Sequence, residues 1–255
     1  MAPGTRAVSV PLLTCLLPPL LLCAGPSRAD EVRVAVASNF AAALRTIADR
    51  FDARTGHETI LAPGSTGKHY AQISQGAPFD VFFAADTHRP ARLERDGMAV
   101  PGSRFTYALG TVVLWSPTPG YVDGRGEVLE AGQFHHLAMA NPRLAPYGKA
   151  AQEILTARGL LDRLRPRLVW GENIGQTFRF VGSGSAELGF VAYSQIARPG
   201  TRPAGSLWRV PRALYTPIAQ QAVLLRDGTA ARAFLAFAQS PEALKIVADY
   251  GYEIP

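Results

Sequence analysis

Short apolar runs alternate with segments of helical periodicity along most of the chain. Residues 32–37 are mostly valine and alanine, and in residues 40–51 the apolar side chains recur at helical spacing. Further apolar runs follow at 58–61, 78–86, 137–142, 167–170 and 187–193. Strands that alternate with helices in this way are joined by right-handed crossovers. We therefore expect an α/β fold in which mainly parallel sheets are flanked by helices.

Polar residues and glycines mark the ends of the helical segments. The pattern predicts one helix that ends near Phe180 and others at 69–75, 90–97, 149–158, 230–239 and 241–250. Ser38 or Asn39 stands at the N-cap position of the first helix, and Ser65 or Thr66 at that of the second. We expect the last two helices to pack back on the first part of the chain.

Two long apolar segments, residues 105–115 and 215–225, resemble each other in length and composition. We interpret them as a pair of connecting strands between two lobes. The first lobe would then be discontinuous in sequence, with residues 30–110 and 218–255, and the second would comprise residues 111–217. Residues 116–127 are rich in proline and glycine and are predicted to form a loop.

Residues 1–29 have the features of a secretory signal peptide. Arg6 supplies a positive start, residues 12–24 are apolar, and residues 27–29 place small side chains at the spacing of a cleavage site. Proline residues at 18 and 19 interrupt the apolar run, which is too short for a stable transmembrane span. We expect the exported chain to begin near Asp30.

Both cysteines, Cys15 and Cys23, lie in this first segment. The processed chain would contain none, so its stability must come from a hydrophobic core, which a chain of this length can form. A lipid anchor on Cys23 is a competing interpretation. Leu22 speaks against it, because a lipoprotein signal normally has a small side chain at that position.

Composition and charge narrow the classes of function. The apolar content of 47% and the charged content of 18% are those of a globular protein. The net charge of +6 falls to +4 when residues 1–29 are removed, because Arg6 and Arg28 are lost and no acid is. The basic residues are scattered along the chain, so we expect no nucleic-acid partner. A mildly positive field can still help to gather an anion.

A glycine-rich stretch, residues 64–68 (Gly-Ser-Thr-Gly-Lys), lies between a predicted strand and a predicted helix. The unpaired backbone N–H groups of such a helix start can bind an anion. The stretch is not a nucleotide P-loop, because Ala62 replaces its first glycine and His69 follows the lysine. A plain helix cap by Ser65 or Thr66 explains the pattern as well as an anion site does.

Other residues with reactive side chains indicate structural roles. We interpret Lys68 as solvated, and Asp80 and Asp86 as partners of loop backbone. Gly184 occupies the position that a nucleophilic serine would need. The histidines show no metal-ligand spacing apart from an adjacent pair on a predicted loop: His57, His69, His88, His135 and His136. We find no catalytic set and expect a protein that is not an enzyme.

With these motifs the chain resembles the periplasmic molybdate-binding proteins of ABC importers. The likeness covers nearly all of the processed chain in the same order. It is carried by Ala-Ser-Asn-Phe at 37–40, by the runs 64–73, 76–86, 102–110 and 113–116, by Ala-Asn-Pro at 140–142 with Ala-Pro-Tyr-Gly at 145–148, and by Gly-Phe-Val-Ala at 189–192.

The resemblance implies a type II periplasmic binding protein fold, with the ligand in a cleft between two lobes. It implies an oxyanion site at the positions of Ser38, Asn39 and Ser65 on the first lobe and Tyr147 and Ile174 on the second. The Asn39 amide would donate to an oxygen of the anion. Phe190 and Tyr193 lie near a position where other members use a tyrosine, and we assign them no role.

The implied function is capture of molybdate, and with it tungstate, in the periplasm for a membrane permease of the ABC class. No cofactor is implied, and molybdenum would be bound only as its oxyanion, through the same five residues. We expect a monomer. A receptor for another tetrahedral oxyanion such as sulfate is the alternative, and an enzyme on the same architecture is a third interpretation, since fold does not determine function.

Overall fold

The structure, a computed structural model, describes residues 1–2, 4, 30–197 and 199–255. The predicted signal segment, with Cys15 and Cys23, lies almost entirely outside the described residues. Within the described ranges, no helix is long and apolar enough to cross a membrane.

The first sheet has five strands in the order β2-β1-β3-β10-β4. These strands are β1 (Glu31–Ala37), β2 (Glu58–Gly64), β3 (Val81–Ala84), β4 (Phe105–Gly110) and β10 (Ile218–Leu224). Strand β1 pairs in parallel with β2 and β3, whereas β10 is antiparallel to both of its neighbours. Four strands therefore run in one direction and only β10 is reversed.

The second sheet repeats this arrangement, in the order β7-β6-β8-β5-β9. Its strands are β5 (Val112–Ser116), β6 (Leu137–Ala140), β7 (Leu168–Gly171), β8 (Leu188–Ala192) and β9 (Ser206–Arg209). Strand β6 is parallel to β7 and β8, and β5 is antiparallel to β8 and β9. The expected mainly parallel arrangement thus holds for four strands of each sheet, and both sheets are mixed.

The reversed strand of each sheet is the one that the chain enters after leaving the other sheet. The segment 105–115 forms two strands rather than one, because β4 ends at Gly110 in the first sheet and β5 starts at Val112 in the second. The chain returns to the first sheet where β10 begins at Ile218.

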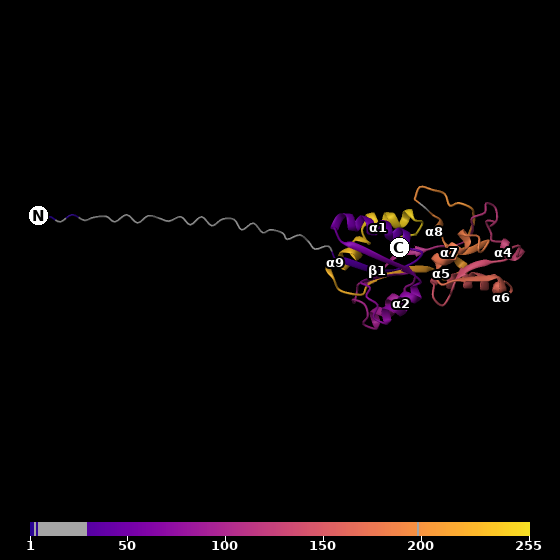
Figure 1. Cartoon of the computed structure of the whole chain (residues 1–255), viewed down its shortest axis with the longest axis horizontal. Helices are drawn as coiled ribbons and strands as arrows, with labels where there is room; N and C mark the ends of the chain where they lie inside the picture. Colours follow the sequence, from indigo (N-terminus) through magenta and orange to yellow (C-terminus); the bar gives the residue numbers. More distant parts are fainter. Residues whose placement is uncertain (3, 5–29, 198) are drawn as a thin grey trace.

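Helices cover both faces of the first sheet. One face packs on α1 (Ala41–Thr55), α9 (Thr229–Phe237) and α10 (Pro241–Asp249), and the other on α2 (Thr66–Ser74) and α3 (His88–Arg95). We call this sheet with these helices the first half. Figure 1 shows α1 and α2 on opposite sides of β1, with the C-terminal helices returning beside α1.

The second half is the second sheet with its own helices. Helix α5 (Pro146–Ala157) covers one face and α7 (Ile174–Gly182) the other. Short helices complete it: the single-turn α-helices α4 (Val128–Ala131), α6 (Leu161–Leu164) and α8 (Tyr193–Ile196), and the 3₁₀ helices η1 (Arg165–Arg167) and η2 (Arg212–Leu214). In Figure 1 this magenta-to-orange half lies beside the indigo and yellow first half.

The observed starts of α1 and α5 differ from the predicted ones. Neither Ser38 nor Asn39 caps α1, because Phe40 is the N-cap residue. The Phe40 N–H bonds to the Ala37 carbonyl at 2.8 Å, so residues 38–40 form a turn before the helix begins. Helix α5 starts at Pro146, a residue whose fixed φ suits the first turn, so Tyr147 lies in the helix and not in a loop before it.

Helix α9 is predicted to be essential for the stability of the first half. The Phe234 ring is fully buried, with its centroid 5.2 Å from that of Phe51 and 6.2 Å from that of Phe83. We expect Phe234→Ala to lower the free energy of unfolding by about 3–5 kcal/mol, the usual cost of such a core truncation. Urea denaturation measures it. Phe237→Ala, at a partly buried position of the same helix, is the control, and an equal loss there would contradict the assignment.

Candidate anion site between the two halves

The predicted site residues follow strands that occupy matching places in the two sheets. Ser38 and Asn39 follow β1, and Ser65 follows β2. In the second half, Tyr147 comes seven residues after the end of β6, and Ile174 follows β7. Since β1 and β2 are adjacent and parallel, and so are β6 and β7, each half presents its loops at one edge of its sheet.

All five predicted residues line one small cavity between the halves. It holds about 180 Å³ of empty space, part of it open to solvent. No acidic or basic side chain is among its lining residues, which are Ala37, Ser38, Asn39, Gly64, Ser65, Thr66, Ala85, Ala145, Pro146, Tyr147, Asn173 and Ile174. The cavity is therefore neutral, and any charge in it must come from what it binds.

The two serines present hydroxyl protons to this cavity. The Ser65 oxygen caps α2 by accepting a hydrogen bond from the Lys68 N–H at 3.3 Å. The Ser38 oxygen accepts one from the Gly175 N–H of the other half at 3.0 Å. A hydroxyl has one donor and two acceptor positions, so each serine can accept from backbone and still donate its proton. Both hydroxyls are thus available as donors.

Backbone N–H groups complete the set of donors. Among the described residues, the N–H groups of Asn39, Ser65, Tyr147 and Ile174 donate no hydrogen bond. The last two lie in the first turns of α5 and α7, where N–H groups have no partner within the helix. Helix starts also carry partial positive charge. The site can therefore surround an anion with donors from both halves.

The side chain of Asn39 does not serve the role expected from the sequence. Its amide nitrogen donates to Gln220 Oε1 at 2.7 Å and to Tyr252 Oη at 2.9 Å, which uses both of its protons. The Asn39 carbonyl in turn accepts from the hydroxyls of Tyr252 and Ser194. The side chain therefore holds the turn after β1 in place, and the N–H of that turn is the group left for a ligand.

The halves meet around the cavity. The Gly67 N–H donates to the Leu144 carbonyl at 2.8 Å, and Lys68 Nζ lies 3.1 Å from a carboxylate oxygen of Glu172. Arg89 Nη2 donates to the Arg143 carbonyl at 3.1 Å. With the Ser38 contact to Gly175, these bonds hold the two halves against each other on several sides of the site.

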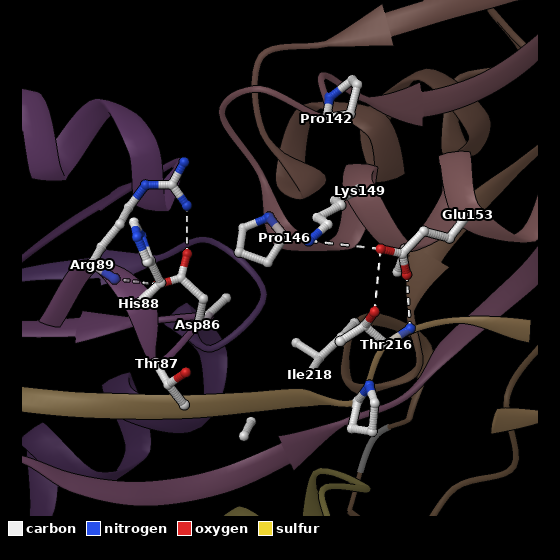
Figure 2. A pocket seen from close by; sticks show the side chains of 14 residues that line it. Asp86, Thr87, His88, Arg89, Pro142, Pro146, Lys149, Glu153, Thr216 and Ile218 are labelled. Atoms are coloured by element: carbon white, nitrogen blue, oxygen red, sulfur yellow. Dashed lines mark hydrogen bonds and ion pairs between the residues drawn. The ribbon is translucent and has the colours of Figure 1, made fainter. Parts of the chain in front are cut away.

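A larger pocket adjoins this cavity and shares Ala85 and Pro146 with it. It holds about 1000 Å³ of empty space, part of it open to solvent. Figure 2 shows Asp86 and Arg89 facing Glu153 across it. Each carboxylate already has partners, because Asp86 pairs with Arg89, and Glu153 accepts from the Thr216 N–H at 2.7 Å. The charges of this pocket are compensated within its own wall.

The other candidate residues have structural partners. The Asp80 carboxylate accepts from the Arg33 N–H at 2.8 Å, and Asp86 accepts from the Arg89 N–H at the start of α3. His135 lies 3.0 Å from Glu187 on an exposed loop. In the described part of the chain, no group of three or more His, Cys, Asp or Glu side chains could hold a metal ion.

Sequence reasoning missed the residues that support the site from behind. Gln220 and Tyr252 hold Asn39, and Asn173 caps α7 by accepting from the Gln176 N–H at 2.9 Å. The sequence pattern does indicate a structural role for Gln220, because a glutamine inside an apolar strand must find hydrogen-bond partners when it is buried. It indicates one for Asn173 too, as an asparagine directly before a helix.

Two α/β halves, joined by two crossings and enclosing a neutral cavity lined with donors, define a two-lobed binding protein. The chain matches the family of bacterial extracellular solute-binding proteins over residues 32–253, and it belongs to that family.

Within this family the chain is similar to proteins named molybdate-binding protein ModA. The protein of Azotobacter vinelandii is 49% identical, over 91% of this chain and 93% of its own length, and that of Rhodobacter capsulatus is 47% identical, over 89% and 90%. The solved structure of the Azotobacter vinelandii periplasmic molybdate-binding protein superposes with a TM-score of 0.85 at 43% identity. It covers 88% of this chain and 99% of that one.

The contact of Gly67 with Leu144 predicts a steric effect on the approach of the halves. A Cβ atom on Gly67 would lie 2.9 Å from the Leu144 carbonyl oxygen, closer than real Cβ contacts. We expect Gly67→Ala to separate the halves and to break the Gly175–Ser38 bond, so that the Gly175 amide exchanges hydrogen faster. Gly182→Ala on α7 is the control, since a Cβ there meets nothing within 4 Å. Unchanged protection of Gly175 in the first variant would contradict this.

His69 predicts a pH dependence of stability. Its ring is buried behind Gly64, and burial lowers the pKa of this imidazole below the usual 6.5. Below about pH 6.5 the unfolded chain takes up a proton that the folded chain resists. The free energy of unfolding should therefore fall as the pH is lowered from there, and less so in His69→Gln. Urea denaturation at several pH values tests this, with His136→Gln on an exposed loop as the control; identical slopes in all three proteins would refute it.

Proposed function

We propose that this protein is a periplasmic receptor that captures molybdate, and tungstate with it, and delivers the anion to an ABC importer. The observation that carries the proposal is the neutral cavity whose donors, two serine hydroxyls and four backbone N–H groups, come from both halves. The names of the relatives, which are molybdate-binding proteins at 47–49% identity, support the choice of anion.

The donor set favours a dianion. Hydrogen bonds from neutral donors to an ionised acceptor are roughly twice as strong as those between neutral groups. The starts of α2, α5 and α7 add partial positive charge around the cavity, so no lysine or arginine is needed in contact with the anion. No carboxylate lines the cavity to repel it.

The same set disfavours a protonated anion. Hydrogen phosphate carries a proton that needs an acceptor, and no carboxylate lines the cavity to accept it. A buried hydroxyl without an acceptor costs about 1–3 kcal/mol. Sulfate has no such proton, and we propose that the cavity discriminates against it by size, because the metal–oxygen bonds of molybdate and tungstate are longer.

Because the hydrogen-bond donors are divided between the two halves, an anion would be bound by closing the halves around it. We propose that residues 30–110 with 218–255 form one lobe and residues 111–217 the other, and that the strand crossings near Gly110 and Ile218 are the hinge. Ser38, Asn39 and Ser65 would hold the anion from one side, and Tyr147 and Ile174 from the other. A ligand that bonds to both sides stabilises the closed form over the open one.

The route to the membrane follows from the same proposal. Residues 1–29 would direct export, and a monomer beginning near Asp30 would present the loaded anion to the permease of its importer. The relatives are named for binding and not for a reaction, which favours a receptor over an enzyme.

Calorimetric titration of the chain from Asp30 with molybdate, tungstate, sulfate and phosphate tests the proposal. We expect tight one-to-one binding of molybdate and tungstate only. Ser65→Ala should weaken molybdate binding about tenfold or more, the effect of losing one hydrogen bond to a charged group, about 1.5–3 kcal/mol. Ser74→Ala, at the far end of the same helix, should leave the affinity unchanged.

Each contrary result has a definite meaning. Tight sulfate or phosphate binding would make this a receptor for another oxyanion. No binding of any of the four anions would refute the receptor function, and turnover of a small substrate that Asp80→Asn abolishes would establish an enzyme. Equal affinities of wild type and Ser65→Ala would remove Ser65 from the site.

A further inference from the structure

Gln220 occupies the place where the two halves and the anion site meet. It lies on β10, the strand that returns from the second half, and its side chain is fully buried. The pairing of β10 with β4 shifts register at this residue, so that Tyr107 is accommodated in a bulge. Bulges of this kind commonly redirect a side chain next to a functional site.

The carboxamide oxygen of Gln220 is committed to the first half. It accepts from Asn39 Nδ2 at 2.7 Å and from Tyr107 Oη at 3.2 Å. The single Tyr107 proton is shared with the Ala84 carbonyl at 3.1 Å, so the orientation is set by Asn39. Its amide nitrogen can only donate, and turning the Gln220 amide around would oppose two donors. The Gln220 nitrogen must therefore point away from Asn39.

On that other side the nitrogen meets the second half. Gln220 Nε2 and Tyr147 Oη are both buried, and among the described residues neither has a hydrogen-bond partner. Both adjoin Gly110, where an added Cβ would lie 3.0 Å from the nitrogen and 2.3 Å from the hydroxyl oxygen. A donor and an acceptor thus lie side by side at the point where the chain crosses between the sheets.

We propose that Gln220 is a positioning residue that couples the anion site to closure of the lobes. Its oxygen holds Asn39, and its nitrogen bonds to the Tyr147 hydroxyl as α5 moves onto β10. The proposal rests on the proposed function, because Asn39 and Tyr147 are the residues whose N–H groups would hold the anion from opposite lobes.

The coupling has a simple physical basis. The Tyr147 N–H lines the cavity while its hydroxyl reaches the hinge, so a shift of the first turn of α5 toward an anion also moves the hydroxyl. An unpaired buried donor and acceptor are unfavourable, and pairing them favours the closed form. Gly110 permits this approach because it has no side chain.

Stopped-flow measurement of molybdate dissociation from the chain starting at Asp30 tests the coupling. Gln220→Leu and Tyr147→Phe should each raise the dissociation rate about tenfold, the change that corresponds to one such bond. Tyr147→Phe keeps the backbone N–H of the site and the partner of Asn39, so it remains informative if Gln220→Leu folds poorly. The double variant should release molybdate no faster than the faster single one, because both changes remove the same bond.

Gln221→Leu is the matched control. This neighbouring glutamine bonds to Thr106 and Arg104, away from the site, and the substitution should leave the dissociation rate at the wild-type value. A merely structural role of Gln220 would lower stability without changing the dissociation rate. That result, or additive effects of Gln220→Leu and Tyr147→Phe, would overturn the proposal.

A second measurement needs no anion. The chain from Asp30 has no cysteine, so cysteines introduced at Met98 and Asp162, which are exposed in the two halves, can carry spin labels. Without ligand, Gln220→Leu and Tyr147→Phe should shift the label distances toward longer values, and Gln221→Leu should not. If the shift occurs but the wild type binds no molybdate, the coupling stands and the proposed function fails. If molybdate binds and no shift occurs, the proposed function stands and the coupling fails.

Discussion

Unpaired backbone N–H groups at helix starts are the constraint on which this structure depends. Every helix begins with N–H groups that find no partner inside it, and burying them unpaired is unfavourable. Here the first turns of α2, α5 and α7 and the turn before α1 converge on one cavity, and the serines at two of these places accept bonds without losing their ability to donate. The sheets, the crossings and the buried glutamine serve to bring these four chain segments to one point.

The repeated strand order explains how the site is assembled. Strands β1 and β2 of the first sheet correspond in position to β6 and β7 of the second, and each pair ends in loops that contribute to the cavity. The reversed strands are β10, which lies next to β3, and β5, which lies next to β8. Each of them brings the chain into its sheet from the other half. The halves are joined by two crossings rather than one, and under the proposed closure these would restrict movement to rotation about the line that joins them.

The sequence predicts the local features of this fold and misses those that depend on distant residues. The cap of α2 by Ser65 and the alternation of strands and helices follow from short patterns, and the structure confirms both. The predicted start of α1 was wrong, because a turn closed by the bond between Phe40 and Ala37 precedes the helix. The orientation of the Asn39 amide depends on Gln220 and Tyr252, which are 181 and 213 residues further along the chain, and no local pattern contains that information.

The contacts between the halves are compatible with the proposed control of their separation by a ligand. The Lys68–Glu172 ion pair is about half exposed on both sides, and such pairs contribute little to stability. The Gly67–Leu144 and Ser38–Gly175 bonds exchange with water when the halves part, so their net contribution is also modest. Most of the apolar core lies within one half or the other, and Ala37, Ala85 and Ile218 of the first half join the core cluster of the second. Under the proposed function, a dianion that receives hydrogen bonds from both halves would then decide between the open and the closed form.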